Sequence, residues 1–120
     1  MPDTRRYLAL LPAPEAEWAA LPESELEAGM ANHARFHEQL ASRGHRLVTA
    51  GPLEPSAQAV SMRNTGRGSV VVTDGPFTES VEQIVGFYLI DTEDEADLVE
   101  VVREFAAGGD HVELRRMAAE

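Results

Sequence analysis

The sequence has 120 residues, with 21 acidic against 10 basic side chains, a formal net charge of −11 and no cysteine. This charge argues against nucleic acid or an anionic membrane as a partner, because phosphate groups bind basic surfaces. The lack of cysteine excludes disulfides, thiolate metal ligands and a cysteine nucleophile, and it suits the cytoplasm. We expect one cytoplasmic domain over residues 1–120, since the first apolar run ends at Pro12, too early for a signal peptide or a membrane span.

The first half of the chain predicts a strand, a long helix and a second strand. The first strand covers residues 7–11 and the second covers residues 47–50. The helix between them covers residues 25–43. Its start is marked either by the capping-box spacing of Ser24 to Glu27 or by Pro22 as the first helical residue.

Two of the four histidines lie on the apolar side of this helix. At about 100° per residue, His33 and His37 fall near the middle of an apolar stripe, so we expect both to face the interior. Each is either a core side chain held by one hydrogen bond or a functional group. His45 and His111 border turns and are expected to face solvent. The stripe itself consists of Leu26, Met30, Phe36, Leu40 and Ala41.

A hairpin is predicted over residues 57–73, around a turn at residues 64–68. It leads directly into the segment Thr73-Asp74-Gly75-Pro76-Phe77. Here Asp can bond the backbone two residues on, Gly supplies backbone freedom, and Pro fixes φ. The segment is therefore a rigid turn holding the Asp74 carboxylate, which either closes its own turn or faces a site.

The remaining elements complete an alternating order of strands and helices. Residues 84–90, which include Tyr88, predict a central strand, residues 92–107 a capped helix, and residues 111–117 a last strand. The order β, α, β, hairpin, β, α, β predicts an α+β fold, a ferredoxin-like sandwich with an inserted β-hairpin and a mainly antiparallel sheet with helices on one face. The uncovered face predicts a homodimer through the sheet.

Three stretches of the chain resemble a known family. They are Val71-Val72-Thr73-Asp74-Gly75-Pro76-Phe77-Thr78-Glu79, followed by Gly86-Phe87-Tyr88-Leu89-Ile90, and the earlier Leu47-Val48-Thr49-Ala50-Gly51-Pro52-Leu53. These resemble the YCII-related family, also called the DGPF-domain proteins. The resemblance implies a dimeric α+β barrel similar to muconolactone isomerase. Some members of that family are lyases that use a His and Asp pair, and many are uncharacterised and encoded beside extracytoplasmic-function sigma factors.

The resemblance also points to particular site residues. The family's acid–base His lies on the first long helix, which by spacing corresponds to His33, with His37 as the alternative. The family's partner Asp follows the second helix beside a Pro, whereas here the loop reaches Asp110 without a Pro. Either Asp74 or Asp110 then orients the imidazole of His33. Tyr88 either donates a hydrogen bond to a substrate or is a core side chain, and Gly75, Pro76 and Phe77 complete the expected pocket.

The sequence predicts neither a metal nor a cofactor. His33 and His37 have the i, i+4 spacing of a zinc-protease helix, but Ala34 stands where the glutamate would follow, and no third ligand is evident. The first functional hypothesis is a small-molecule lyase or isomerase in which His33, oriented by Asp74, moves a proton in an apolar pocket. The alternative is a non-catalytic dimer that binds a small-molecule ligand or a regulatory partner such as a sigma factor.

Overall fold

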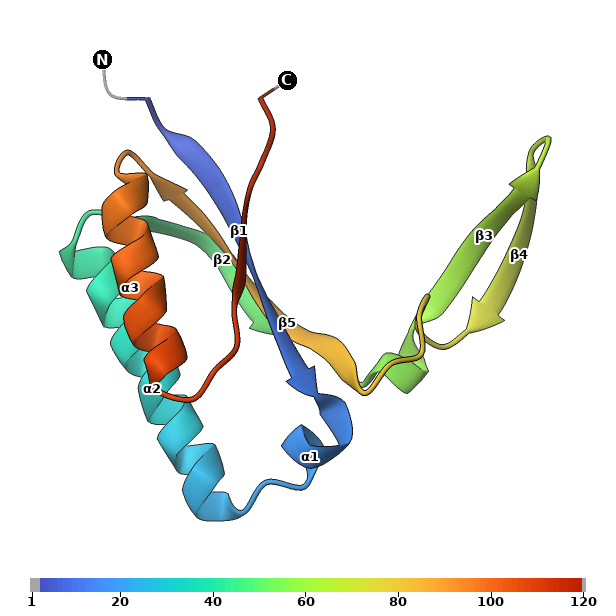
Figure 1. Ribbon diagram of the computed structural model, residues 1–120, viewed down its shortest axis with the longest axis horizontal. Helices are drawn as coiled ribbons and strands as arrows, with labels where there is room; N and C mark the ends of the chain where they lie inside the picture. Colours follow the sequence, from blue (N-terminus) through green and yellow to red (C-terminus); the bar gives the residue numbers. More distant parts are fainter. Residues whose placement is uncertain (1–2, 120) are drawn as a thin grey trace.

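The computed structural model describes residues 3–119 and contains one sheet, one separate hairpin and three α-helices among them (Figure 1). The elements in chain order are β1 (Arg5–Pro14), α1 (Glu15–Ala19), α2 (Glu23–Ser42), β2 (Arg46–Pro52), a 3₁₀ turn (Ser56–Gln58), β3 (Val60–Gly66), β4 (Ser69–Asp74), β5 (Glu82–Thr92), α3 (Glu95–Ala107) and β6 (Glu113–Arg116).

The sheet confirms the predicted fold class. Its strand order is β2-β5-β1-β6, and every neighbouring pair is antiparallel. Helices α2 and α3 cover one face, as in a ferredoxin-like α+β fold (Figure 1). The β3–β4 hairpin pairs only within itself in the described chain and projects away from the sheet.

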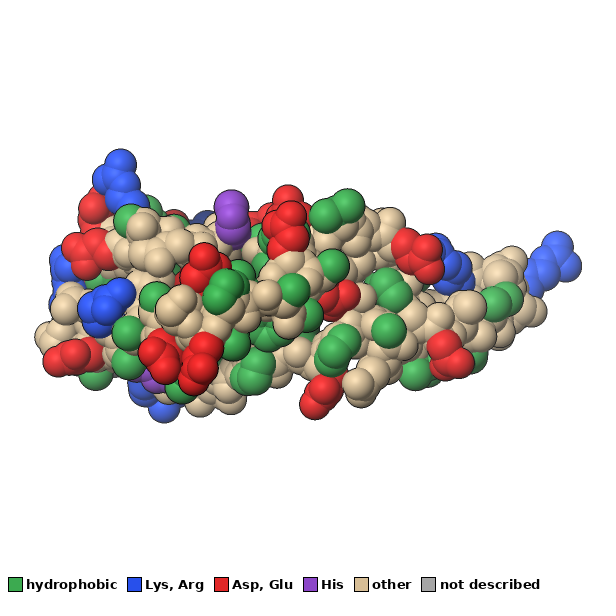
Figure 2. Space-filling model, turned by 90° about the horizontal axis from the view of Figure 1, so that it is seen from below, with side chains coloured by type: hydrophobic (Ala, Val, Ile, Leu, Met, Phe, Trp, Pro, Cys, Tyr) green, Lys and Arg blue, Asp and Glu red, His purple; other side chains and the backbone are tan. Residues whose placement is uncertain are grey.

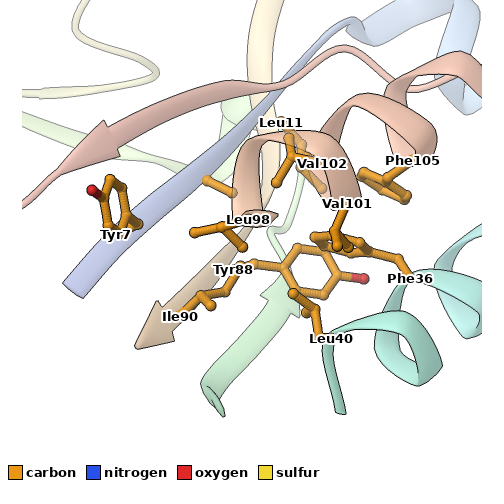
Figure 3. Packing of buried hydrophobic residues seen from close by; sticks show 11 residues of the cluster. Tyr7, Leu11, Phe36, Leu40, Tyr88, Ile90, Leu98, Val101, Val102 and Phe105 are labelled. Carbon is orange, nitrogen blue, oxygen red and sulfur yellow. The ribbon is translucent and has the colours of Figure 1, made fainter. Parts of the chain in front are cut away.

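The core lies between the sheet and the two long helices. On β1 and β5 the cross-strand pairs Tyr7–Ile90 and Ala9–Tyr88 face the helices, because alternate residues of a strand point to opposite faces. Figure 3 shows Tyr88 and Ile90 among the side chains of α2 and α3. The helical side supplies Phe36, Leu40, Leu98, Val101, Val102 and Phe105.

The starts of both long helices differ in detail from those expected, which were Ser24 to Glu27 or Pro22 for the first helix and residue 92 for the second. Pro22 is the N-cap of α2 and makes no capping hydrogen bond through its side chain. The first helical residue is therefore Glu23, one residue before Ser24. The N-cap of α3 is Asp94, whose carboxylate accepts a hydrogen bond from the backbone N–H of Asp97. Thr92 instead ends β5. Asp94 caps the helix as a capping-box side chain would, because its carboxylate accepts a hydrogen bond from a backbone N–H that has no partner within the helix.

The expected apolar stripe of α2 is buried only in its C-terminal half. Phe36 and Leu40 are in the core, but Leu26 and Met30 are exposed, the latter at 72%. Leu26 and Met30 are exposed because the part of α2 that packs in the core begins only at Phe36. Asn32, which the predicted stripe did not include, is buried, with only 3% of its surface exposed.

His45 is buried, which corrects the expectation that it faces solvent. Its Nδ1 lies 2.7 Å from the Thr92 hydroxyl and its Nε2 lies 2.7 Å from an Asp97 carboxylate oxygen. The residue lies just before β2 and contacts Asp97 near the start of α3, so a position that borders a turn in the sequence is covered in the fold. His111 is exposed as expected.

In the described part of the chain, no helix has the length and apolar character needed to cross a membrane.

Candidate functional site

A largely apolar pocket opens between α2 and the sheet, next to α1. Its volume is about 520 Å³. The polar side chains in its wall are His33, His37, Tyr88 and Asp110. The apolar part of the wall is formed by Leu11, Trp18, Met30, Ala50, Pro52, Val85 and Phe87.

The polar side chains form one continuous chain of contacts. The Tyr88 hydroxyl lies 2.5 Å from Nδ1 of His33 and 3.2 Å from Nε2 of His37. Nε2 of His33 lies 3.7 Å from the Asp110 carboxylate. His33 is half-buried and His37 is exposed, so the chain runs from solvent at His37 to a carboxylate in the pocket wall.

Tyr88 stays protonated at the centre of this chain. Burial raises the pKa of Tyr88 to about 12, with a further contribution from the negative charge of Asp110. A hydroxyl has one hydrogen to donate, so it donates to one histidine and accepts from the other. The two histidines must therefore present opposite roles to Tyr88, one as acceptor and one as donor.

Asp110 is held in place by Asn32. The buried Asn32 amide donates hydrogen bonds to the backbone carbonyl of Phe105 at 2.8 Å and to Asp110 at 2.9 Å. Burial disfavours the charged carboxylate, but the interaction with His33 and the hydrogen bond from Asn32 outweigh it and hold the pKa of Asp110 below its ordinary value. Asp110 is therefore ionised at neutral pH and places a negative charge beside His33.

The two glycines after α3 explain how Asp110 reaches His33. A Cβ on Gly108 would stand 2.1 Å from Oδ1 of Asn32, so only glycine lets the end of α3 approach that amide. Gly109 has φ 122, a conformation that residues with a side chain rarely adopt. In the sequence this pair marks the end of a helix, and it is also the local signal of a tightly folded loop before Asp110.

Aromatic rings hold His33 and Tyr88 against the core. The His33 ring meets Phe105 edge to face, with 4.9 Å between centroids. Phe36 packs on Phe105 at 4.3 Å and meets Tyr88 at 4.8 Å. These contacts restrict the rotamers of the two polar groups, as a preorganised site requires.

Asp74 lies away from this pocket, which corrects the expectation that it orients His33 in the same chain. It ends β4, opposite Val60 at the base of the hairpin, and is exposed. A separate groove of about 410 Å³ contains Asp74, Gly75 and Pro76 but not His33. The carboxylate beside His33 is that of Asp110, the other candidate, because the turn after α3 folds back onto α2.

The Asp-Gly-Pro-Phe turn closes the base of the hairpin. Gly75 has φ 108, donates its N–H to the carbonyl of Ala59 at 2.6 Å and accepts the Ser61 hydroxyl at 2.7 Å. Phe77 is exposed and stacks under the Arg63 guanidinium at 3.9 Å. Within one chain these contacts give the turn a structural role and place Gly75, Pro76 and Phe77 outside the His33 pocket.

The two helix histidines both point to Tyr88. Among residues 3–119, no group of three or more His, Cys, Asp or Glu side chains stands close enough to hold a metal ion. The i, i+4 pair thus shares a hydroxyl partner.

Comparison with known proteins agrees with this fold. The YCII-related domain matches residues 6–117 of the chain. A stretch of 63 residues is 40% identical to an uncharacterized protein of Rhizobium meliloti (strain 1021), covering 48% of this chain and 50% of that protein. The chain thus matches about half the length of this curated relative.

Proposed function

The chain belongs to the YCII-related domain family, and from its pocket we propose that it is a cofactor-independent lyase or isomerase that moves a proton on a small, partly apolar molecule. The observation that carries this proposal is the pairing of His33 with Asp110 in the wall of an apolar pocket. A histidine is suited to this work because its ordinary pKa lies near neutral pH.

The shared Tyr88 hydroxyl supports both an acid and a base role for His33. When Tyr88 donates to His37, His33 donates from Nδ1 to the Tyr88 oxygen and its Nε2 is free to act as a base. Once Nε2 has taken a proton from the substrate, the same atom carries the hydrogen that it gives back as an acid. An isomerisation needs both roles, because the proton taken from one carbon is returned to another.

Asp110 stabilises the intermediate stage of this transfer. As Nε2 of His33 takes a proton from a substrate C–H bond, the electron pair of that bond moves into the substrate and the imidazole becomes positively charged. The ionised Asp110 beside it offsets this charge. In a lyase the same electron pair forms a double bond and expels a leaving group.

Hydrogen–deuterium exchange tests this proposal without a known substrate. The protein is incubated in D₂O with a panel of small lactones and ketones, and ¹H NMR follows loss of carbon-bound hydrogen. We expect catalysed exchange for at least one compound and its loss in His33→Ala, because the abstracted proton equilibrates with solvent. Equal exchange rates for the two proteins would contradict the proposal.

Tyr88→Phe refines the test with a matched control. We expect exchange to fall about 10- to 100-fold, since the hydroxyl connects the two histidines while the ring keeps its packing. Tyr7→Phe is the control, because the buried Tyr7 hydroxyl has no hydrogen-bond partner among residues 3–119. Its exchange rate should match that of the wild type.

A non-catalytic role is the second candidate, a dimer that binds a small molecule or a regulatory partner such as a sigma factor. One observation favours it: His33 and His37 already have a hydrogen-bond partner in Tyr88, which a purely structural histidine pair would also have. Ligand binding by the pocket that survives His33→Ala, without any exchange in the wild type, would support this alternative.

The sheet supports a homodimer in either case. Leu8, Leu10 and Leu89 form what we call the open face, the side of the central strands turned away from the helices. Apolar side chains on an uncovered face favour association, and a twofold axis lets one face cover its equal. We place this dimer in the cytoplasm, which suits a chain without cysteine.

A further inference from the structure

The β3–β4 hairpin, residues 60–74, forms an arm with one apolar side (Figure 1). The pairing Met62–Val72 puts these side chains on the same side as Val60 and Val70. All four are exposed, at 55–63%. An isolated two-stranded hairpin is only marginally stable in water, so this apolar side needs a covering surface.

The mouth of the His33 pocket is a second uncovered apolar surface. Met30 and Trp18 line the pocket and are 72% and 41% exposed. In Figure 1 the arm of the same chain points away from α2, with α1 and the ends of the sheet between them. The arm therefore leaves its own pocket uncovered, and a cover must come from another molecule.

Opposite charges favour a second copy of this chain as the molecule that covers the pocket mouth. Residues 60–74, the arm, contain Arg63 and Arg67 and a single acidic side chain, Asp74, at its base. Residues 15–34, which form α1 and the first part of α2 beside the pocket, contain Glu15, Glu17, Glu23, Glu25 and Glu27 and no Lys or Arg. Figure 2 shows acidic side chains over the helical body and a basic group at the far end of the arm. Opposite charges on two parts of one chain favour reciprocal pairing about a twofold axis.

We propose that the arm of a second copy of this chain lies across the pocket mouth, with Met62 and Val72 against Met30 and Trp18. A seven-residue strand spans about 23 Å, which exceeds the 17 Å thickness of the molecule. The arm can therefore pass the edge of the partner and reach its pocket. This inference rests on the proposed ligand pocket, which the arm closes against water and completes with apolar side chains.

Engineered cysteines test directly whether the arm of one copy lies across the pocket mouth of the other, because the chain has no cysteine of its own. Met62→Cys and Met30→Cys proteins, of which one carries a mass tag, are mixed and oxidised. Both positions are exposed, so neither change disturbs the core. We expect a disulfide between the two variants to dominate over either symmetric product. In 1 M salt it should form several-fold more slowly, as charges are screened.

The control is Val71→Cys mixed with Met30→Cys. Val71 lies on the same arm, 50% exposed, but on its opposite side, so we expect little cross-linking. Three outcomes would overturn the inference. The two pairs could cross-link equally, or the protein could sediment as a monomer at the same concentration. Met62→Cys could also link preferentially to a Leu10→Cys variant, which carries its cysteine on the open face. Because cross-linking requires no turnover, it should persist in a His33→Ala background, and loss of exchange there leaves this result intact.

Discussion

Single hydroxyl and carboxylate groups determine what the pocket can do. The Tyr88 hydroxyl ties His37 to His33, and Asp110 faces the far nitrogen of His33. Neither histidine would be unusual alone. Their chemical value comes from sharing one hydrogen of Tyr88, which cannot be donated to both at once.

The carboxylate of Asp110 makes stability depend on pH. Its pKa is lower in the folded protein than its ordinary value of about 3.9. Its contribution to the free energy of unfolding is therefore present above that value and is lost as pH falls through the folded pKa. We expect Asp110→Asn to be less stable than the wild type at pH 7, with a difference that shrinks toward pH 3. Urea unfolding at several pH values measures this, and a difference that stays constant down to pH 3 would contradict it.

At the scale of elements, most of the fold could be predicted from the sequence. Residues 84–90 predicted a central strand because they are nearly all apolar, and β5 is central in the sheet. The neighbour of His33 could not be predicted in the same way. Asp110 meets Asn32 across 78 positions of sequence, through a loop whose path depends on packing between α2 and α3. Asp74 attracted attention because its turn is locally distinctive, but turn chemistry does not say what the turn faces.

The end of α3 offers a sharp test of this packing. Gly108 has φ −79, so alanine fits its backbone, but the new Cβ would overlap the Asn32 amide. We expect Gly108→Ala to lower the free energy of unfolding by about 1–3 kcal/mol, from overpacking and strained hydrogen bonds. Urea denaturation gives this value.

Gly29→Ala is the matched control for that substitution. Gly29 lies within α2, where nothing stands within 4 Å of an added Cβ. It should raise stability by up to about 1 kcal/mol, because alanine is the better helix former. If Gly108→Ala unfolded at the same urea concentration as the wild type, this result would contradict the close contact between the end of α3 and Asn32.

The whole molecule is flat, which makes its second sheet face available. Its shortest dimension is 17 Å, the thickness of one helix layer on one sheet. Helices cover only one side of that sheet (Figure 1), while the apolar side chains of the open face are half-buried and those of the arm are exposed. Both surfaces occur on the same chain, so one twofold pair can cover both.

A single charge on the open face tests whether it is the dimer contact. Leu10 lies between Phe87 and Glu113 in the sheet, so in Leu10→Glu a new carboxylate stands beside an existing one. Burying it in a dimer would cost desolvation and repulsion. We therefore expect sedimentation equilibrium at micromolar concentration to show a dimer for the wild type and a monomer for Leu10→Glu. Val99→Glu adds the same charge at a position 45% exposed on α3, in the opposite layer, and should leave the dimer intact. Dimers of equal strength in both variants would place the contact elsewhere.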